Sequence, residues 1–160
     1  LEQVAALAGA QGVRLSAERG LALVVPASRS AVLQAELARA GFIVAPDDPR
    51  RAVAACPGAP ACRSGTTPVP DHAARLAQAL APLAGLTAHV SGCAKGCAHP
   101  GPADLTLVGR DGAYDVVFAG PPSAEPATRL AFEVALDRIR KAAAAGLPAL
   151  DPVFQDDVPG

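Results

Sequence analysis

The stretch "VSGCAKGCAHPG" (Val90–Gly101) carries the pattern from which the fold of this chain can be predicted. Two cysteines, Cys93 and Cys97, stand with three residues between them in a loop of small residues. Lys95 lies between the two cysteines, and His99 follows shortly after them. Such a pair suits a metal site, a disulfide or a reactive thiol pair, so the other cysteines of the chain are needed to choose among them.

The other two cysteines lie upstream in "ACPGAPACRSG" (Ala55–Gly65), where five residues separate Cys56 from Cys62. Because no signal-peptide pattern opens the chain, these four cysteines favour a metal site over disulfides. Structural zinc usually takes tighter cysteine pairs, whereas an iron–sulfur cube is larger and suits wider, unequal spacings. Spacing alone therefore favours a cluster and leaves zinc, disulfides and unligated thiols open.

Glycines and prolines shape both cysteine loops. Pro57 and Pro60 stiffen the first loop and remove two backbone donors. Gly58, Gly92 and Gly96 allow the backbone to approach inorganic sulfide, and the remaining loop N–H groups can then hydrogen-bond to sulfur. These residues are what a loop wrapped around a cluster requires.

The segments around the second cysteine loop predict an α/β domain. Asp71 can cap a helix, and Asp111-Gly112 is a strong two-residue hairpin signal. Further on, charged residues spaced by four predict one solvated helix face. The predicted elements are the helix Asp71–Leu83 (apolar face Ala73, Leu76, Ala77, Leu80), the strands Thr87–Val90, Leu105–Val108 and Tyr114–Phe118, and the helix Ala124–Ala145 (charged face Arg129, Glu133, Asp137, Lys141).

The first part of the chain has a different pattern, in the order helix, strand, strand, helix, strand. This order is that of a ferredoxin-like βαββαβ unit without its first strand. Either Ser28 or Ser30 can cap the second helix, which would turn Val32, Leu33 and Leu37 inward. The predicted elements are the helix Leu1–Ala10, the strand Val13–Ala17, the hairpin connection Glu18–Gly20, the buried strand Leu21–Val25, a helix to about Ala40 and the strand Phe42–Ala45.

Together these patterns predict an α+β chain of three parts. Residues 1–47 form the truncated ferredoxin-like half domain, residues 48–146 the cluster-binding domain, and residues 147–160 a loose tail. A first residue other than Met indicates a fragment or a processed piece. The composition is 3% aromatic with a net charge of −1, so nothing favours binding to nucleic acid or anionic membranes, and no apolar run is long enough to span a bilayer.

The motif "ACPGAPAC" followed by "SGCAKGCAHPGPADLTLVG" resembles the cluster-binding signature of the nitrite/sulfite reductase superfamily, Cys-x5-Cys and then Cys-x3-Cys. The four-cysteine signature is highly specific to the superfamily. Within it, "SGCAKGCAHPGPAD" is most similar to the precorrin-3B synthase family, and this narrower choice rests on Lys95, His99 and Pro100. The similarity covers nearly the whole chain, since the preceding ferredoxin-like unit also occurs in that family.

The resemblance implies that Cys56, Cys62, Cys93 and Cys97 hold a 4Fe–4S cluster. In the sirohaem-containing members, the cysteine at the position of Cys97 also bridges to the sirohaem iron. Precorrin-3B synthases instead take the tetrapyrrole precorrin-3A as substrate. They hydroxylate it with dioxygen and with reducing equivalents from NADH, and they are described as having a mononuclear non-haem iron beside the cluster. The chain would then be the C-terminal, cluster-binding half of a cytoplasmic cobalamin-biosynthesis monooxygenase, inactive without its N-terminal half.

Candidate substrate-binding residues follow from the many carboxylates of a tetrapyrrole. Arg51, Arg63 and Lys95 lie within a few residues of the cysteines and could bind carboxylates. Arg51 and Arg63 could equally be solvated loop charges, whereas Lys95 lies inside the Cys-x3-Cys loop. His99 could ligate the second iron, donate a proton or bind substrate, and a local structural role is an equally good interpretation.

The remaining candidate ligands favour structural roles. His72 lies on the polar side of its predicted helix and His89 in a strand. Asp104 is the nearest carboxylate to the second cysteine pair, but it could simply start the following strand. One histidine without an obvious carboxylate partner does not make a facial-triad iron site, so the sequence does not locate the oxygen-activating iron.

Two further functions stay open at the level of sequence. A sirohaem-dependent sulfite or nitrite reductase shares the cysteine signature. A non-catalytic iron–sulfur electron-transfer module would need only the cysteines and the surrounding fold. The presence of sirohaem, and of a first half that completes the pocket, would separate these possibilities.

Overall fold

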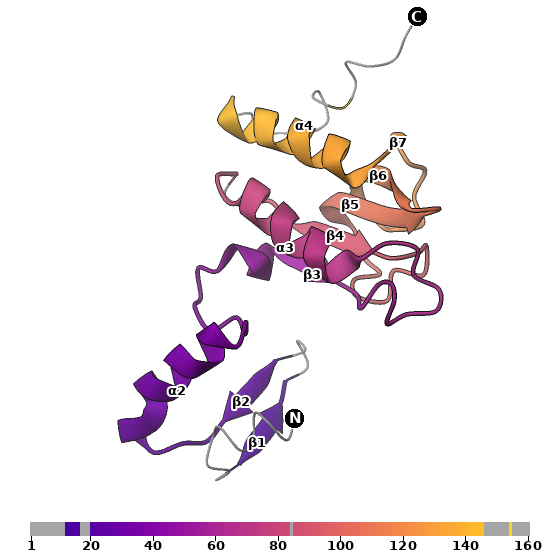
Figure 1. The fold of residues 1–160 in the computed structure, drawn as a ribbon. Helices are drawn as coiled ribbons and strands as arrows, with labels where there is room; N and C mark the ends of the chain where they lie inside the picture. The colour runs from indigo at the N-terminus through magenta and orange to yellow at the C-terminus, as the bar shows by residue number, and fades with distance from the viewer. Residues whose placement is uncertain (1–11, 17–19, 84, 146–153, 155–160) are drawn as a thin grey trace, which may run out of the picture. The chain divides into compact units, whose positions relative to one another are not determined.

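The computed structural model describes residues 12–16, 20–83, 85–145 and 154. The chain divides into two compact units, Leu1–Asp48 and Pro49–Gly160 (Figure 1). The sequence placed this boundary after Asp47. No helix in the described part of the chain is long and apolar enough to cross a membrane.

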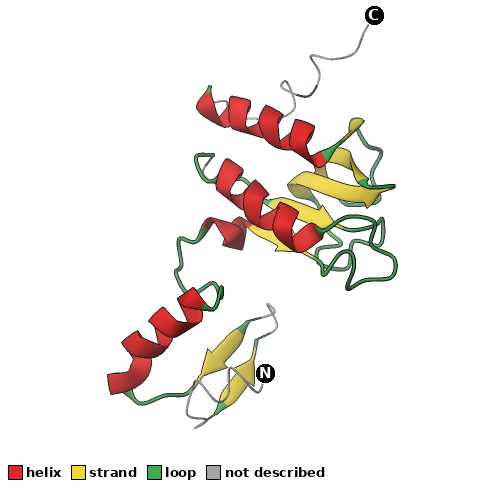
Figure 2. Ribbon diagram, viewed as in Figure 1, coloured by secondary structure: helices red, strands yellow, loops and turns green. Residues whose placement is uncertain are grey.

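The second unit is built on a five-stranded sheet with the order β3-β4-β5-β6-β7 (Figure 2). Neighbouring strands are parallel from β3 to β5 and antiparallel from β5 to β7. A 3-10 helix, η1 (Pro49–Ala52), precedes the sheet. The strands are β3 (Val53–Ala55), β4 (Ala88–Ser91), β5 (Ala103–Arg110), β6 (Ala113–Gly120) and β7 (Thr128–Leu130); helix α3 (Val69–Leu80) joins β3 to β4, and α4 (Phe132–Ala144) follows β7.

Both helices pack on one face of this sheet, and there they form the core. Side chains on a strand alternate between the two faces, and every second residue of β4, β5 and β6 belongs to the cluster that packs on α3 and α4. The predicted apolar face of α3 is confirmed. The strand members are Ala88, Val90, Leu105, Leu107, Tyr114 and Val116, and the helix members include Leu76, Leu80, Phe132, Leu136 and Ile139.

The opposite face of the sheet is also buried, but its side chains are more polar. His89, Thr106 and Asp115 are each at most 4% exposed, and all three belong to the alternate set of strand positions. Thr106 Oγ1 donates a hydrogen bond to the carbonyl oxygen of Gly120 at 2.9 Å. Polar groups buried in this way require hydrogen-bond partners at fixed positions. This face therefore restricts which groups can pack against it more than a purely apolar face would.

The hairpin between β5 and β6 forms where the sequence predicts it. Asp111 and Gly112 have φ angles of 52° and 81°, and both values lie in the left-handed region. A two-residue hairpin of the primed type requires positive φ at both central positions, which Asp and Gly tolerate. Strands β5 and β6 are longer than predicted, but the turn is confirmed.

The last helix starts later than predicted. The spacing of charged residues predicted a helix from Ala124, whereas α4 begins at Phe132 and β7 precedes it. Pro126 disfavours helical geometry at the residue before it, and the residues after it pair with β6 as a strand, so the helix begins only at Phe132. Arg129 therefore lies in a strand opposite Asp115 and not on the charged face of the helix.

In the first unit, β1 (Val13–Leu15) pairs antiparallel with β2 (Leu21–Leu23), and α2 (Ala27–Arg39) follows. The expected cap is wrong, since Ser28 and Ser30 lie inside α2 and no side chain caps its first turn. Leu33 is buried as predicted, Leu37 is half-buried, and Val32 is 54% exposed.

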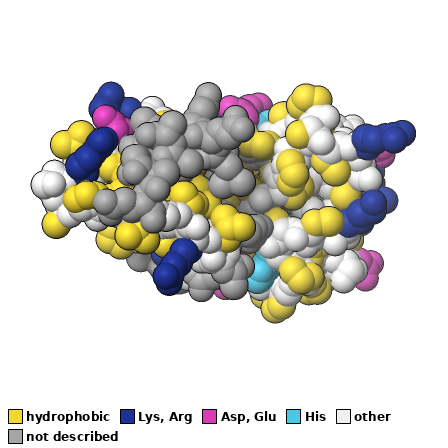
Figure 3. Space-filling model, turned by 90° about the horizontal axis from the view of Figure 1, so that it is seen from below, with side chains coloured by type: hydrophobic (Ala, Val, Ile, Leu, Met, Phe, Trp, Pro, Cys, Tyr) yellow, Lys and Arg dark blue, Asp and Glu magenta, His cyan; other side chains and the backbone are white. Residues whose placement is uncertain are grey.

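Two further expectations for this unit are wrong. Strand β2 is not buried, because Leu21 is 38% exposed, and Phe42–Ala45 forms no strand. Extended backbone needs a neighbouring ladder to become a strand, and in the described part of this unit only β1 and β2 pair. A view from below shows hydrophobic side chains on the surface of the protein (Figure 3). The predicted helix Leu1–Ala10, the last residue of the predicted strand Val13–Ala17, residues 18 and 19 of the hairpin connection and nearly all of the predicted tail lie outside the described residues.

Candidate functional site

The two cysteine loops begin side by side at one edge of the sheet. Cys56 directly follows β3, and Cys93 follows β4 after a single residue, Gly92. Because the two strands are parallel and adjacent, their carboxyl ends lie at the same edge. The N–H of Cys56 donates to the carbonyl of Val90 at 3.4 Å, and the N–H of Gly92 donates to Cys56 Sγ at 3.2 Å. The first cysteine of each pair is therefore positioned by backbone pairing.

Close packing of glycine backbones holds the loops together. A Cβ placed on Gly92 would lie 3.1 Å from the Cα of Gly58 and 3.2 Å from the Cα of Gly65. A Cβ on Gly109 would lie 2.7 Å from the carbonyl oxygen of Gly92. These neighbours are main-chain atoms that cannot rotate away, so a side chain at any of these positions would separate the two loops from each other or from β5.

Gly58 has a further constraint, because its φ angle is +59°. Gly96 also has a positive φ, +61°, and a Cβ there would lie 2.6 Å from Pro122 Cγ. The sequence assigned Gly58, Gly92 and Gly96 to contact with sulfide, and the structure shows that each also makes room for protein atoms. Gly65 carried no signal beyond its position close to a cysteine.

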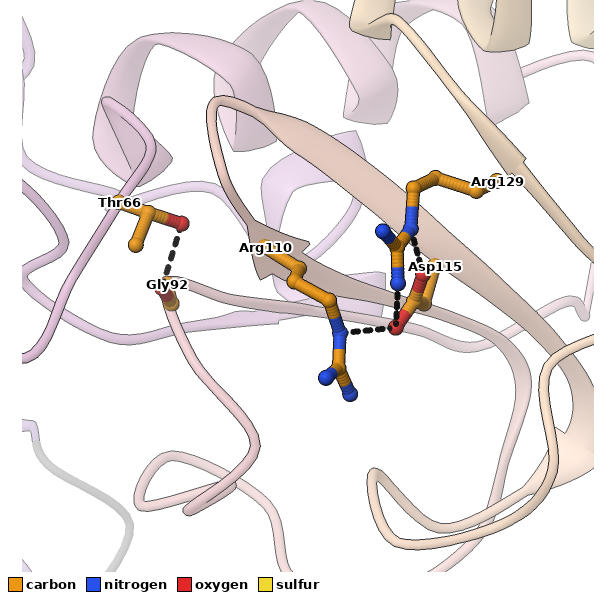
Figure 4. A network of polar contacts seen from close by, with 5 residues as sticks. All are labelled: Thr66, Gly92, Arg110, Asp115 and Arg129. Carbon is orange, nitrogen blue, oxygen red and sulfur yellow. Dashed lines mark hydrogen bonds and ion pairs between the residues drawn. The ribbon is translucent and has the colours of Figure 1, made fainter.

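Hydrogen bonds complete the connection between the loops. Thr66 donates to the carbonyl of Gly92 through its N–H at 2.9 Å and through its hydroxyl at 3.4 Å (Figure 4). Ser91 Oγ donates to the carbonyl of Cys93 at 2.7 Å. Within the first loop, the N–H of Cys62 donates to the carbonyl of Gly58 at 2.7 Å. The loops thus form one connected structure.

All four cysteines are free thiols. Cys56, Cys62 and Cys93 are half-buried, whereas Cys97 is exposed. Among the described residues, no group of three or more His, Cys, Asp or Glu converges on a single metal ion. Four thiols on two interlocked loops, with a backbone N–H already donating to one sulfur, fit the donor set of a thiolate-bound cluster that is wider than one ion.

The predicted cations are placed unequally around the cysteines. Lys95 Nζ donates to Ser64 Oγ at 3.2 Å, so Lys95 joins the second loop to the first. Arg63 is exposed in the first loop. Arg51 is exposed in η1, which precedes β3, and it therefore lies at the opposite end of this strand from Cys56. Only two of the three cations lie in the cysteine loops.

His99 has a local partner in the structure. Its Nε2 donates to the carbonyl of Pro102 at 3.0 Å, and its backbone N–H donates to the carbonyl of Gly96 at 3.1 Å. Its ring meets the buried ring of His89 edge-on, with 5.9 Å between the centroids. These contacts hold the chain that leaves the second cysteine loop, and they agree with a structural role for both histidines.

His72 packs into the core between the helices and the sheet. Its ring stacks on Phe132 at 3.8 Å between centroids, and its Nδ1 lies 2.9 Å from the hydroxyl of Tyr114. Burial lowers the pKa of His72 and raises the pKa of Tyr114 to about 12. In both groups burial disfavours the charged form, which agrees with structural side chains.

Asp104 stabilises the start of β5. Its carboxylate accepts hydrogen bonds from Thr87 Oγ1 at 2.6 Å and from the Thr87 N–H at 2.8 Å. These two bonds lower the pKa of the Asp104 carboxyl. This placement agrees with the strand-starting interpretation.

A second polar cluster was missed at the level of sequence. Asp115 is 4% exposed, and its carboxylate accepts hydrogen bonds from Nε of Arg129 at 2.6 Å and Nε of Arg110 at 2.7 Å. The hydrogen bond from Arg129, assisted by that from Arg110, lowers the pKa of the Asp115 carboxyl. The sequence did contain one signal for this cluster, because Asp115 is a charged residue in the apolar stretch that forms β6. It was not recognised because Arg129 was expected to lie on a helix.

Comparison with known proteins identifies the fold first. No family model matches the chain. Among solved structures, the NirA protein of Mycobacterium tuberculosis, of the nitrite/sulfite reductase family, superimposes with a TM-score of 0.65 and 20% identity. The match covers 88% of this chain and 31% of NirA. The chain therefore has the α+β fold of the nitrite/sulfite reductase type, as predicted.

A particular relative then follows from the sequence. The chain is 40% identical over 129 residues to the curated precorrin-3B synthase of Sinorhizobium sp.. The alignment covers 79% of this chain but only 28% of the relative. The expected resemblance to precorrin-3B synthase is confirmed, and it is shown for a stretch that corresponds to less than a third of that protein.

Proposed function

We propose that this chain is the cluster-binding part of a precorrin-3B synthase, an oxygen-dependent monooxygenase that converts precorrin-3A to precorrin-3B in cobalamin biosynthesis. The main structural support is the pair of interlocked cysteine loops at the carboxyl ends of β3 and β4. The identity to a precorrin-3B synthase favours this function over others that use the same fold. The N-terminal half, expected to complete the tetrapyrrole pocket, is part of the proposal.

Cys56, Cys62, Cys93 and Cys97 would hold a 4Fe–4S cluster, which would supply one-electron transfer. The residues around the four cysteines would stabilise the charge of the thiolates and hold the two loops in place. The N–H of Gly92 points at Cys56 Sγ and would stabilise its negative charge, while Lys95 would keep the two loops in register through Ser64. Cys97 is exposed whereas the other three are half-buried, so it would be the cysteine most accessible to a second group or substrate.

The proposal assigns no residue to a mononuclear iron. His99 is hydrogen-bonded to the carbonyl of Pro102, and Asp104 is hydrogen-bonded to Thr87. In the described part of the chain, no three suitable side chains converge on one ion. Precorrin-3A, dioxygen and reducing equivalents from NADH belong to the complete enzyme. A cytoplasmic location is expected because iron–sulfur clusters are damaged by oxygen.

Iron and sulfide analysis after anaerobic purification tests the cluster. We expect about four irons and four sulfides per chain. Cys97→Ser should lower both values, whereas Ser28→Ala, an exposed position on α2 that keeps every cysteine and lies outside the cysteine loops, should retain the cluster. Zinc without sulfide would refute the proposal in favour of a structural zinc site, and an iron content unaffected by Cys97→Ser would remove this residue from the ligand set.

A sirohaem sulfite or nitrite reductase is the second candidate, favoured by the likeness to NirA. The full-length protein should be purified and its visible spectrum recorded. A strong sirohaem spectrum would overturn the monooxygenase, whereas conversion of precorrin-3A in the presence of dioxygen and a reductant would support it. A cluster-containing full-length protein with neither activity would favour a non-catalytic electron-transfer module.

A further inference from the structure

The sheet brings two arginines to the same edge as the cysteine loops. Strands β3, β4 and β5 run parallel, and β7 runs antiparallel to β6, so β7 has the direction of β5. Their carboxyl ends therefore share one edge. Arg110 is the last residue of β5, and Arg129 is the second-last residue of β7. In open α/β sheets this is the edge at which ligands bind.

Arg110 is also close to the second cysteine loop through the backbone. Ser91 pairs with Val108, and the backbone of the next residue, Gly109, lies against the carbonyl of Gly92. Gly92 precedes Cys93 and Gly109 precedes Arg110. The arginine thus leaves β5 beside the point where the chain enters the cysteine loop.

Both guanidinium groups are positioned by one buried carboxylate (Figure 4). Asp115 accepts from Nε of Arg110 and from Nε of Arg129, and its side chain is 5% exposed. The arginine side chains are 52% and 49% exposed. Each arginine thus donates its Nε to Asp115, while about half of each arginine side chain is exposed to solvent.

Among the residues that the structure describes, the terminal amines of these arginines have few partners. Within the part of the chain that the structure describes, Arg110 makes its contact through Nε alone, and the further contact of Arg129 is a 3.5 Å bond from one terminal nitrogen to Asp115. The two guanidinium groups and the Asp115 carboxylate together carry a charge of +1, and the total falls to zero when Asp111 is counted with them. Asp111, in the adjacent hairpin, is a second negative charge near Arg129.

We propose that Arg110 and Arg129, oriented by Asp115, form a binding site for a carboxylate group of a ligand that lies over the cysteine-bearing edge of the sheet. Planar guanidinium groups match carboxylates through paired N–H donors, and a guanidinium whose orientation is already set loses less entropy on binding. The identity of the ligand rests on the proposed function: it is the tetrapyrrole, whose carboxylate side chains extend beyond its ring. The site lies outside the set Arg51, Arg63, Lys95 and His99 that the sequence offered for substrate.

Binding of two probes to the full chain tests this site. Uroporphyrin, a tetrapyrrole rich in carboxylates, is titrated by fluorescence, and citrate is titrated by calorimetry at low salt. Arg110→Gln and Arg129→Gln should each weaken uroporphyrin binding about tenfold, the size expected for loss of one charge-assisted contact. Arg140 is exposed on α4, which packs on the other face of the sheet, so Arg140→Gln is the matched control and should bind like the unchanged chain.

Two further variants separate binding from folding. Arg110→Lys keeps the positive charge near Asp115 but loses the planar fork, so it should fold normally and still bind more weakly. Asp111→Asn removes a negative charge near Arg129 and should tighten binding, a gain that damage to the fold would not produce. Circular dichroism of every variant identifies those that have lost structure.

Each outcome bears on the site. Equal uroporphyrin affinity in Arg110→Gln, Arg129→Gln and Arg140→Gln would overturn the site while leaving tetrapyrrole binding, and hence the proposed function, intact. Citrate binding that is lost in the two arginine variants, without uroporphyrin binding, would support the carboxylate site and count against the tetrapyrrole. Absence of binding by both probes to the unchanged chain would overturn the site.

Discussion

Replacing Gly58 with alanine tests whether the close approach of the two cysteine loops depends on the absence of side chains. A Cβ at this position would lie 2.7 Å from the carbonyl oxygen of Thr67 and 2.7 Å from the backbone nitrogen of Val69. The φ angle of +59° is unfavourable for alanine as well. Left-handed geometry costs about 1–2 kcal/mol and overpacking about 1–3 kcal/mol. We therefore expect the free energy of unfolding to fall by about 2–5 kcal/mol, out of a typical total of about 5–15 kcal/mol.

Two matched glycines divide this loss into its parts. Gly112 has a φ of +81° and no atom within 4 Å of a built Cβ, so Gly112→Ala should cost only the backbone term, about 1–2 kcal/mol. Gly92 is not in the left-handed region, so Gly92→Ala should show only the steric part, about 1–3 kcal/mol.

Urea unfolding of the three variants and the unchanged chain provides the measurement. The single tyrosine of the chain, Tyr114, is fully buried in the second unit, so its fluorescence reports the unfolding of that unit without interference from tryptophan. Iron and sulfide content should fall with stability in Gly58→Ala and Gly92→Ala and stay unchanged in Gly112→Ala. If Gly58→Ala costs no more than Gly112→Ala, the argument from close backbone packing is refuted.

Three other predictions concern the second unit. Because burial lowers the pKa of His72, the unfolded chain binds more protons than the folded one, so stability should fall as the pH drops below the unfolded value of about 6.5; His72→Gln should remove this dependence in urea titrations at several pH values. The pKa of Asp104 is also lowered, so the stability that it contributes should be lost at more acidic pH, as the pH falls through its folded value, and Asp104→Asn should show no such step in acid unfolding monitored by circular dichroism. Leu136→Ala, fully buried on α4, should cost about 2–5 kcal/mol in the same urea assay, whereas Val134→Ala, 43% exposed on the same helix, should cost much less, and equal losses would show that α4 does not pack as described.

The elements of the second unit that the sequence predicts well are those with short-range causes. The Asp111-Gly112 turn follows from the backbone angles that this pair allows, and the buried face of α3 follows from its helical periodicity. Local signals thus determine these elements without reference to the rest of the molecule.

The first unit was predicted less well because burial depends on partners. Val32 and Leu21 are apolar and match inward-facing patterns, yet both are exposed. Phe42–Ala45 has strand-like composition but forms no ladder. Sequence patterns report which side chains favour burial, and a neighbouring element must be present before they are buried.

By itself the sequence showed that the four cysteines are grouped into two pairs, and this grouping carried the resemblance from which the fold type was correctly expected. Both features depend only on residue type and spacing. Only the tertiary structure decided what surrounds the cysteines. Gly58, Gly65, Gly92 and Gly109 meet because parallel strands bring distant segments to one edge, and Arg110 and Arg129 meet on Asp115 because a hairpin and a third strand place them there. Contacts of this kind join residues far apart in the chain, and only the sheet brings them within reach of one another.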